Sequence, residues 1–217
     1  MRPPPWLNRI MRIAFHLLYN ELAWTYDLVS WSVSVGQWRA WQRAALPYLR
    51  RGKVLEIAHG TGDLLLDLQA QGYPAVGLDL SPRMGRLARR KLRTHRLATP
   101  LVRGNVRALP FASDTFSSLV STFPAEFILE PQAIAEFHRV LEPGGVLVIV
   151  PAAQITGPAL PDRLAEWLFR ITGQAAAAGS SNSVPPNPYT PAGFATRIER
   201  VRLARSLVTL VIAVKGP

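Results

Sequence analysis

Cysteine is missing from this sequence of 217 residues. Its absence excludes a disulfide-stapled scaffold, thiolate ligation of a metal and a cysteine nucleophile. Histidine is scarce as well, with 4 residues, and no group of His, Asp and Glu has the spacing of metal ligands. We therefore expect no bound metal.

Long apolar runs are also lacking. Ile13–Tyr19 and Leu207–Val214 are too short to cross a bilayer. The N-terminal stretch Ile10–Leu18 is interrupted by Arg12 and His16, and no small-residue cleavage site follows, so it does not have the pattern of a signal peptide. These features predict a cytoplasmic protein.

Acidic residues are few: 14 Asp and Glu stand against 25 Lys and Arg, which gives a formal net charge of +11. A basic surface can attract nucleic acid or anionic lipid. Arginine dominates the basic residues, and the chain is also rich in Ala, Leu and Pro, a bias that a GC-rich genome produces by itself. We favour this compositional explanation and do not expect nucleic acid as a partner.

Apolar residues make up 48% of the chain, which is typical of one globular domain with a substantial core. Between residues 53 and 150, strand-like and helix-like patterns alternate, which predicts βαβ units and a parallel sheet with helices on both faces. The predicted strands are Lys53–Ala58, Ala75–Leu80, Leu101–Asn105, Phe116–Phe123 and Val146–Val150, and the predicted helices are Asp63–Ala70, Pro82–Leu97 (capped by Ser81) and Pro131–Leu141 (ended by Pro143-Gly144-Gly145).

The last third of the chain has a different pattern. Pro158–Thr172 is typical of a helix, and Gly173–Pro191 is a long loop of small and polar residues. Phe194–Leu203 and Ser206–Lys215 are strand-like and so close together that they predict an antiparallel hairpin. The expected fold is therefore α/β, with a doubly wound, mainly parallel sheet of seven strands that ends in this hairpin.

The first fifty residues look helical and hold five of the six tryptophans. Trp31, Trp38 and Trp41 have helical spacing with Val35, which predicts one apolar stripe. We expect this segment to form a helical cap or lid packed on the main domain. The alternative is a peripheral contact with the inner face of a membrane, since Trp favours interfaces.

A glycine-rich turn follows the first predicted strand, in Val54-Leu55-Glu56-Ile57-Ala58-His59-Gly60-Thr61-Gly62. Glycines let the backbone approach a ligand closely, and the following helix presents free N–H groups. Asp79 comes nineteen residues after Gly60, at the end of the second strand, where a carboxylate can accept hydrogen bonds from both hydroxyls of a ribose. Together these features predict an adenosine-containing ligand.

Two details argue against a nicotinamide or flavin dinucleotide. Leu65 occupies the place of the third glycine, which lets the helix pack beside a pyrophosphate. Glu56 precedes the turn, and a carboxylate aimed into the pocket would repel a pyrophosphate but suits a cationic ammonium. S-adenosylmethionine has an α-ammonium group and a sulfonium, and it has no phosphate.

The segment Leu55–Gly62 resembles motif I of class I S-adenosylmethionine-dependent methyltransferases. Val76–Pro82 with Met84 resembles motif II, and further matches lie in Gly104–Phe111 and Glu136–Leu147. The group that the chain resembles most is the type 11 methyltransferase domain, which includes quinone-pathway enzymes. The resemblance implies a Rossmann-like fold with a reversed last strand, S-adenosylmethionine as cofactor and S-adenosylhomocysteine as product.

The resemblance also implies a set of cofactor contacts. Glu56 would face the methionine ammonium, and Asp79 would hold the ribose. Ala58 stands where the family prefers its first glycine, and we expect an extended backbone there, which a small side chain tolerates. Asn105 stands where the family often has Asp, and its amide still offers a carbonyl to the adenine amino group. The remaining implied contacts are Gly60 and Gly62 around the methionine, Leu80 and Met84 beside the adenine, Val106 at the adenine edge, and Ser121 or Thr122 at the methionine end.

Methyl transfer needs a base only if the acceptor has not already lost its proton. Candidate bases are His59, Tyr26 and Glu126. We favour a small, apolar or aromatic acceptor, lipid-like or quinone-like, because the aromatic N-terminus and the basic charge suit a substrate at a membrane surface. We interpret the chain as a single methyltransferase domain with a cap at 1–50, a cofactor-binding core at 51–150 and an acceptor side at 151–217.

Two other functions stay open at this point. Arg83–Arg107 holds nine basic residues and no acid, so an RNA or protein methyltransferase could use it to track phosphates. We favour the solvated face of a helix as the explanation of this stretch. The chain could also bind S-adenosylmethionine without catalysis. The sequence does not indicate an oligomeric state.

Overall fold

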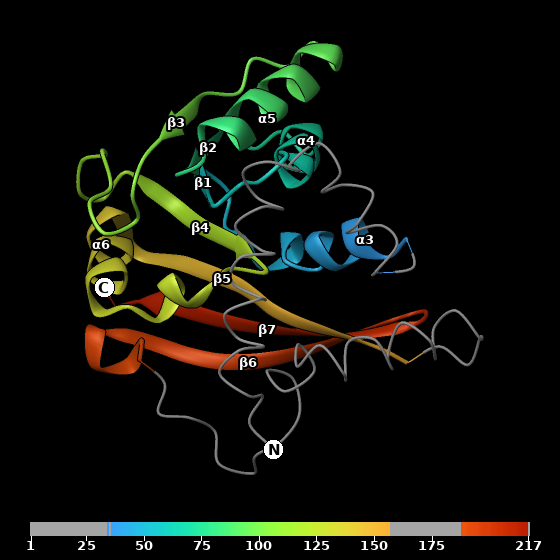
Figure 1. Ribbon diagram of the computed structural model, residues 1–217. Coiled ribbons are helices and arrows are strands. Elements are labelled where there is room, and N and C mark those ends of the chain that lie inside the picture. The colour runs from blue at the N-terminus through green and yellow to red at the C-terminus, as the bar shows by residue number, and fades with distance from the viewer. Residues whose placement is uncertain (1–33, 35, 157–187, 217) are drawn as a thin grey trace, which may run out of the picture.

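The computed structural model describes residues 34, 36–156 and 188–216, and its centre is a seven-stranded sheet (Figure 1). The strand order is β3-β2-β1-β4-β5-β7-β6. Neighbours from β3 to β5 run parallel, whereas β7 is antiparallel to both β5 and β6, which confirms the predicted arrangement. The strands are β1 Val54–Ile57, β2 Ala75–Asp79, β3 Leu101–Arg103, β4 Phe116–Thr122, β5 Leu141–Ile155, β6 Phe194–Leu203 and β7 Ser206–Lys215.

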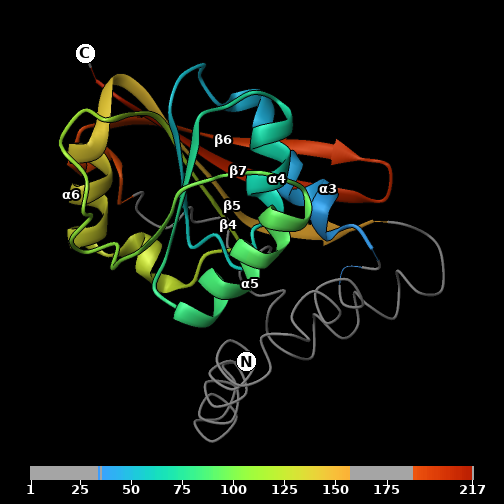
Figure 2. The ribbon, with the colours of Figure 1, turned by 90° about the horizontal axis from the view of Figure 1, so that it is seen from above.

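Helices cover both faces of the sheet, as the sequence predicts. Seen from above, α6 lies on one side of the strands, and α3, α4 and α5 lie on the other (Figure 2). The helices and short 3-10 turns are α3 Trp38–Arg43, η2 Leu46–Tyr48, α4 Asp63–Ala70, α5 Pro82–Thr94, η3 Glu126–Leu129, α6 Pro131–Val140 and η4 Thr190–Ala192.

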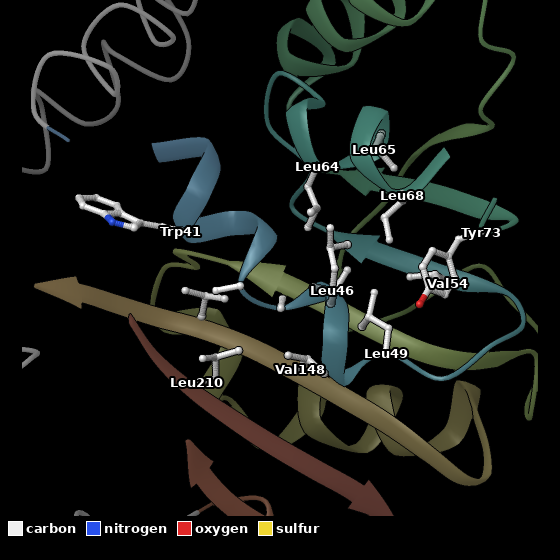
Figure 3. Packing of buried hydrophobic residues seen from close by; sticks show 14 of the residues in the cluster. Trp41, Leu46, Leu49, Val54, Leu64, Leu65, Leu68, Tyr73, Val148 and Leu210 are labelled. Atoms are coloured by element: carbon white, nitrogen blue, oxygen red, sulfur yellow. The ribbon is translucent and has the colours of Figure 1, made fainter. Parts of the chain in front are cut away.

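Two apolar clusters form the core, one on each face of the sheet. Successive residues of β1 point to opposite faces, so Val54 packs in the cluster below α3 and α4, and Leu55 packs in the cluster below α6. Figure 3 shows the first cluster, where Leu64 and Leu68 of α4 and Leu46 of η2 meet the strands. Because both faces of the sheet are covered, consecutive residues of β1 and β4 are buried instead of alternating between buried and exposed.

The helix α5 begins as predicted and ends earlier. Ser81 is its N-cap, and the Ser81 hydroxyl accepts a hydrogen bond from the backbone N–H of Met84 at 3.3 Å. The helix ends at Thr94 and not at Leu97, because Arg96 adopts a left-handed backbone with a φ of 56°.

The junction between α6 and β5 corrects two predicted boundaries. We expected Pro143-Gly144-Gly145 to end the helix and the strand to start at Val146. Instead α6 ends at Val140 and β5 begins at Leu141. The pairing of β5 with β4 shifts here, since Leu141 lies opposite Phe116 and Val146 lies opposite Ser118. Gly144 has a φ of 69°, so the Pro-Gly-Gly segment forms an irregularity within the strand.

The described part of the N-terminal cap is packed on the domain. Trp41 is 1% exposed, and its indole Nε1 donates a hydrogen bond of 2.8 Å to the Ser206 hydroxyl. Arg39 and Arg43 of α3 both bind the carboxylate of Asp67 in α4, at 2.9 and 2.7 Å. These contacts favour the packed helix over a membrane contact for Trp41.

Several predicted features lie outside the described residues. They include the candidate base Tyr26, the tryptophans Trp6, Trp24 and Trp31, the helix Pro158–Thr172 and most of the loop that follows it. Among the helices that the structure describes, none is long and apolar enough to cross a membrane.

Candidate functional site

The glycine-rich turn lies at the carboxyl end of β1, at a reversal point of the sheet. β1 pairs with β2 on one side and with β4 on the other. In open α/β sheets, ligands bind where the strand order reverses, outside the carboxyl ends of the strands. Residues 58–62, Asp79 at the end of β2 and Thr122 at the end of β4 therefore share one edge of the sheet.

The backbone of the turn is left-handed at three positions, with φ values of 56° at Ala58, 54° at Gly60 and 85° at Gly62. The expectation of an extended Ala58 is therefore wrong. A left-handed backbone costs a residue with a side chain roughly 1–2 kcal/mol, so the turn holds Ala58 under strain. A side chain at Gly62 would in addition place its Cβ 3.0 Å from the Cβ of Ala88 in α5.

Asp79 joins the two loops that follow β1 and β2. One carboxylate oxygen accepts the backbone N–H of Gly60 at 2.9 Å, and the other accepts the backbone N–H of Ser81 at 2.8 Å. Each oxygen keeps lone-pair capacity, so the partly exposed carboxylate can still accept hydrogen bonds from a ligand. The cap of α5 is Ser81, so Asp79 acts on the turn and not as the helix cap.

Glu56 has the most unusual environment in the site. Its side chain is 1% exposed, and its Oε2 atom has no hydrogen-bond partner among the residues that the structure describes. Burial raises the pKa of Glu56 well above its ordinary value, and the negative charges of Asp63, Asp79 and Asp67 raise this pKa further. An ionised Glu56 therefore requires a cation beside it.

His59 is packed into the base of the turn. Its ring is 4% exposed, and its Nδ1 lies 2.9 Å from the carbonyl oxygen of Gly60. A carbonyl only accepts, so Nδ1 carries the proton of the neutral ring and Nε2 is left as an acceptor. Burial lowers the pKa of His59, although the nearby charge of Asp79 opposes this effect. Gly77 makes room for the ring, because a Cβ there would lie 2.9 Å from the His59 Cδ2.

His59 and Asp79 line a cavity of about 180 Å³ beside β2 and β3. The rest of the wall comes from α5, its cap and β3, namely Ser81, Pro82, Gly85, Arg86, Arg89, Leu101, Val102 and Arg103.

The residues expected near an adenine differ in exposure. Leu80 is 62% exposed, whereas the Met84 side chain is 1% exposed and packs under α5. Asn105 is exposed, and its Oδ1 accepts the backbone N–H of Arg107 at 3.0 Å. Val106 packs at the edge of the core. Leu80 and Asn105 thus offer surface to a ligand, whereas the side chain of Met84 is buried in the core.

At the end of β4, two hydroxyls are already engaged. Ser121 is fully buried and donates a hydrogen bond of 2.9 Å to the carbonyl oxygen of Ile57, so it ties β4 to β1. Thr122 accepts a hydrogen bond of 3.2 Å from the Gln42 amide. Phe123 follows with a φ of 51° and stacks on Trp38, with the ring centroids 4.3 Å apart.

Gln42 is a feature that the sequence did not reveal. Its side chain is 7% exposed, and within the described part of the chain its Oε1 atom has no hydrogen-bond partner. It reaches the end of β4 from α3, eighty residues earlier in the chain. No local pattern signals such a contact. The candidate base Glu126 lies nearby in sequence, on η3, and is exposed.

Comparisons with known proteins agree with this geometry. A family model described as a methyltransferase domain matches residues 54–145. The ubiquinone/menaquinone biosynthesis C-methyltransferase UbiE of Syntrophotalea carbinolica is 37% identical over 66% of this chain and 63% of its own length. The demethylmenaquinone methyltransferase of Mycobacterium tuberculosis is 33% identical over 76% of this chain and 70% of its own length.

Among solved structures, a candidate S-adenosylmethionine-dependent methyltransferase from Methanococcus maripaludis has a TM-score of 0.70 with 18% identity, over 92% of this chain and 94% of that protein. This likeness shows the fold. The chain spans less than two thirds of the length of several curated relatives, including 63% of the Syntrophotalea protein and 65% of a UbiE protein from Roseobacter denitrificans.

Proposed function

This chain belongs to the class I S-adenosylmethionine-dependent methyltransferases of the quinone-pathway group, and from that premise we propose that it transfers a methyl group from S-adenosylmethionine to a small, quinone-like acceptor. Of the relatives named above, one is a ubiquinone/menaquinone biosynthesis C-methyltransferase and the other is a demethylmenaquinone methyltransferase. The proposal includes a cytoplasmic protein that works at the inner face of the membrane, where such an acceptor resides.

The unpaired carboxylate oxygen of Glu56 is the observation that carries the cofactor assignment. The α-ammonium of S-adenosylmethionine would pair with it and would keep this buried carboxylate ionised. A pyrophosphate at the same place would add negative charge beside Glu56, Asp63 and Asp79. The donor set therefore fits a sulfonium nucleoside and disfavours a dinucleotide.

The other contacts follow from the same placement. Asp79 would bind the ribose hydroxyls with its remaining lone pairs, and the exposed Leu80 would lie against the adenine. Asn105 and Val106 would meet the adenine edge, and the backbone at Gly60 and Gly62 would pass around the methionine. Thr122, which is only partly buried, would close the methionine end, and the buried Ser121 would support it by tying β4 to β1. S-adenosylhomocysteine, the product, has the same ammonium and ribose and would bind through the same residues.

When bound, the cofactor supplies an electrophilic methyl group on its sulfonium. The chain's residues hold the reactants in line and exclude water. Such positioning can lower the barrier by about 7–11 kcal/mol. Of the candidate bases, His59 suits proton removal because its lowered pKa keeps the ring neutral with Nε2 free to accept. Glu126 is a second candidate, and Tyr26 lies outside the described residues.

The end of β4 and the helix α3 would receive the acceptor. The stack of Trp38 and Phe123 offers a flat apolar wall for an aromatic ring. The buried Gln42 Oε1 beside Thr122 has no donor among the described residues, and a hydrogen bond from a bound acceptor would remove the free-energy cost of leaving this oxygen unpaired. A ring hydroxyl of a reduced quinone would supply that donor.

Calorimetry followed by a transfer assay tests the proposal. Purified protein should bind S-adenosylmethionine and S-adenosylhomocysteine, and it should methylate a prenylated 1,4-naphthohydroquinone that has a free ring carbon. Methyl transfer to RNA or protein instead of the hydroquinone would refute the proposal of a quinone-like acceptor. Binding of the cofactor with no transfer to any of these would assign the chain as a non-catalytic binding protein. If the protein binds a dinucleotide and has no affinity for S-adenosylmethionine or S-adenosylhomocysteine, the whole assignment is overturned.

A further inference from the structure

Four arginines form one exposed stripe on α5. Arg86, Arg89, Arg90 and Arg93 have the spacing i, i+3, i+4 and i+7, so they share one face of the helix, which we call the arginine face. Together with Thr94 they line a surface hollow of about 470 Å³.

No carboxylate neutralises the arginine face within residues 34, 36–156 and 188–216. Two other basic residues near this helix do pair with carboxylates: Lys91, on another side of the same helix, pairs with Asp63 at 2.8 Å, and Arg107 pairs with Glu130 at 2.5 Å. Like charges one helical turn apart destabilise a helix. An anion bound from outside would therefore reduce the repulsion between the guanidinium groups of the arginine face.

The helix cannot turn this face away from solvent. Met84, Ala88 and Leu92 on the opposite side are at most 2% exposed and anchor α5 to the sheet. The guanidinium groups are thus presented on a rigid platform. Two of them, Arg86 and Arg89, also line the cavity that contains His59 and Asp79, so the arginine face borders the candidate cofactor site.

We propose that the arginine face docks the protein on an anionic membrane surface by binding lipid phosphate groups. Guanidinium groups match phosphate oxygens in charge and geometry. The stretch from Arg83 to Arg107 contains no Phe, Tyr or Trp, so it lacks the stacking platforms typical of single-stranded nucleic-acid sites. The preference for a bilayer over other polyanions also rests on the proposed function, because a quinone-like acceptor is embedded in lipid.

Co-sedimentation with vesicles tests the docking surface. The parent protein should bind vesicles of phosphatidylglycerol mixed with phosphatidylcholine, should not bind phosphatidylcholine alone, and should lose binding as salt rises. The double variant Arg90→Gln/Arg93→Gln should bind about 25-fold more weakly, since each arginine near an anionic surface contributes about fivefold. These two arginines line the hollow and not the cavity beside Asp79.

The matched control is Arg200→Gln/Arg202→Gln, which removes the same charge from exposed positions on β6. It should retain vesicle binding within about twofold. Equal loss in both double variants would show that net charge alone drives binding and would overturn the proposal. Binding of a mixed-sequence RNA that depends on Arg90 and Arg93, without vesicle binding, would also overturn it and assign the face to nucleic acid.

The proposed function and the docking surface can be tested independently of each other. Methyl transfer to a detergent-solubilised hydroquinone should be equal in the parent and in Arg90→Gln/Arg93→Gln. Vesicle binding that maps to the arginine face without any methyl transfer by the parent would refute the proposed function and leave the docking surface intact.

Discussion

Ala58 shows how one side chain can be at odds with the turn that holds it. The turn requires a left-handed backbone at Ala58, Gly60 and Gly62, and only the first has a Cβ. A left-handed backbone costs an L-residue roughly 1–2 kcal/mol, a cost that glycine does not have. Part of this difference is offset because glycine has more conformational freedom in the unfolded state. Strain at this position is consistent with a turn shaped for a ligand.

Ala58→Gly should therefore raise the free energy of unfolding by about 1 kcal/mol in chemical denaturation. The control is Ala125→Gly, at an exposed position whose φ of −74° suits any residue, and it should lower stability by about 0.5–1 kcal/mol. A loss of stability in Ala58→Gly similar to that of the control would show that the turn is not strained.

Glu56→Gln should separate cofactor binding from stability. It keeps the shape of the side chain and removes a charge whose loss the fold tolerates. Affinity for S-adenosylmethionine and S-adenosylhomocysteine should fall by at least about tenfold in calorimetry, because a charge-assisted hydrogen bond to the ammonium disappears. Glu142→Gln, on β5 at the far end from the turn, is the control and should bind normally. Unchanged affinity in Glu56→Gln would remove Glu56 from the site.

The pH dependence of Glu56 has a definite sign. Burial raises its pKa in the folded protein, so folding favours the protonated form. The associated stability is complete below the unfolded pKa, about 4.3, and is lost as pH rises through the folded pKa. Parent and Glu56→Gln should therefore have similar unfolding free energies at low pH and diverge in favour of the variant as pH rises. A constant difference across that range would contradict the raised pKa.

At the scale of elements, α3 is held in place by contacts to α4 and β4. Asp67 of α4 binds Arg39 and Arg43, and Gln42 and Trp38 reach the end of β4. The sequence predicted helical character here but not these partners. The sequence also placed most starts of strands and helices correctly and erred mainly at their ends. At the α6–β5 junction, the Pro-Gly-Gly segment does not end the helix but lies within β5, where Gly144 adopts a left-handed backbone.

Asp67→Asn should loosen α3. Burial alone would raise the pKa of Asp67, but hydrogen bonds from Arg43 and Arg39 outweigh it and lower this pKa. The two arginines are about half exposed, so the loss should be modest, about 1–2 kcal/mol in the free energy of unfolding at neutral pH. Because the folded pKa is lowered, the contribution exists above the unfolded pKa and is lost as pH falls through the folded pKa. Parent and variant should thus converge in acid, and a gap that persists there would argue against the ion pairs.

Gln42→Leu tests the acceptor side of the proposal. Its KM for the prenylated naphthohydroquinone should rise about tenfold, since the ring hydroxyl loses its partner, and its affinity for the cofactor should stay unchanged. Gln71→Leu, an exposed position after α4, is the control. Equal KM values for parent, Gln42→Leu and Gln71→Leu would show that Gln42 does not contact the acceptor.

At the scale of the whole molecule, distant parts of the chain close one core. The hydrogen bond from Trp41 to Ser206 joins α3 to β7 across 165 residues, and both side chains are buried. β7 in turn pairs with β5 and extends the parallel sheet into the terminal hairpin. The cap and the hairpin should therefore unfold together with the central strands.

A double-mutant cycle on Trp41→Phe and Ser206→Ala measures this link. Each single variant should lower the free energy of unfolding, Trp41→Phe by about 1–3 kcal/mol because it also leaves unfilled space. The coupling between them should be about 1 kcal/mol, the usual net value of a buried hydrogen bond. Additive effects would indicate that the two side chains act independently.

Local sequence patterns are enough to fix the order of the elements, the glycine turn and the acidic strand end, because periodicity, caps and turns are set by residues adjacent in the chain. From these came the sheet class and the positions of Glu56, Gly60 and Asp79. The packed fold set the backbone of Ala58, the oxygens of Glu56 and Gln42 that have no partner among the described residues, and the arginine face, for which the described residues supply no carboxylate. Those features depend on which distant side chains come together in the packed core, and no local pattern encodes that choice.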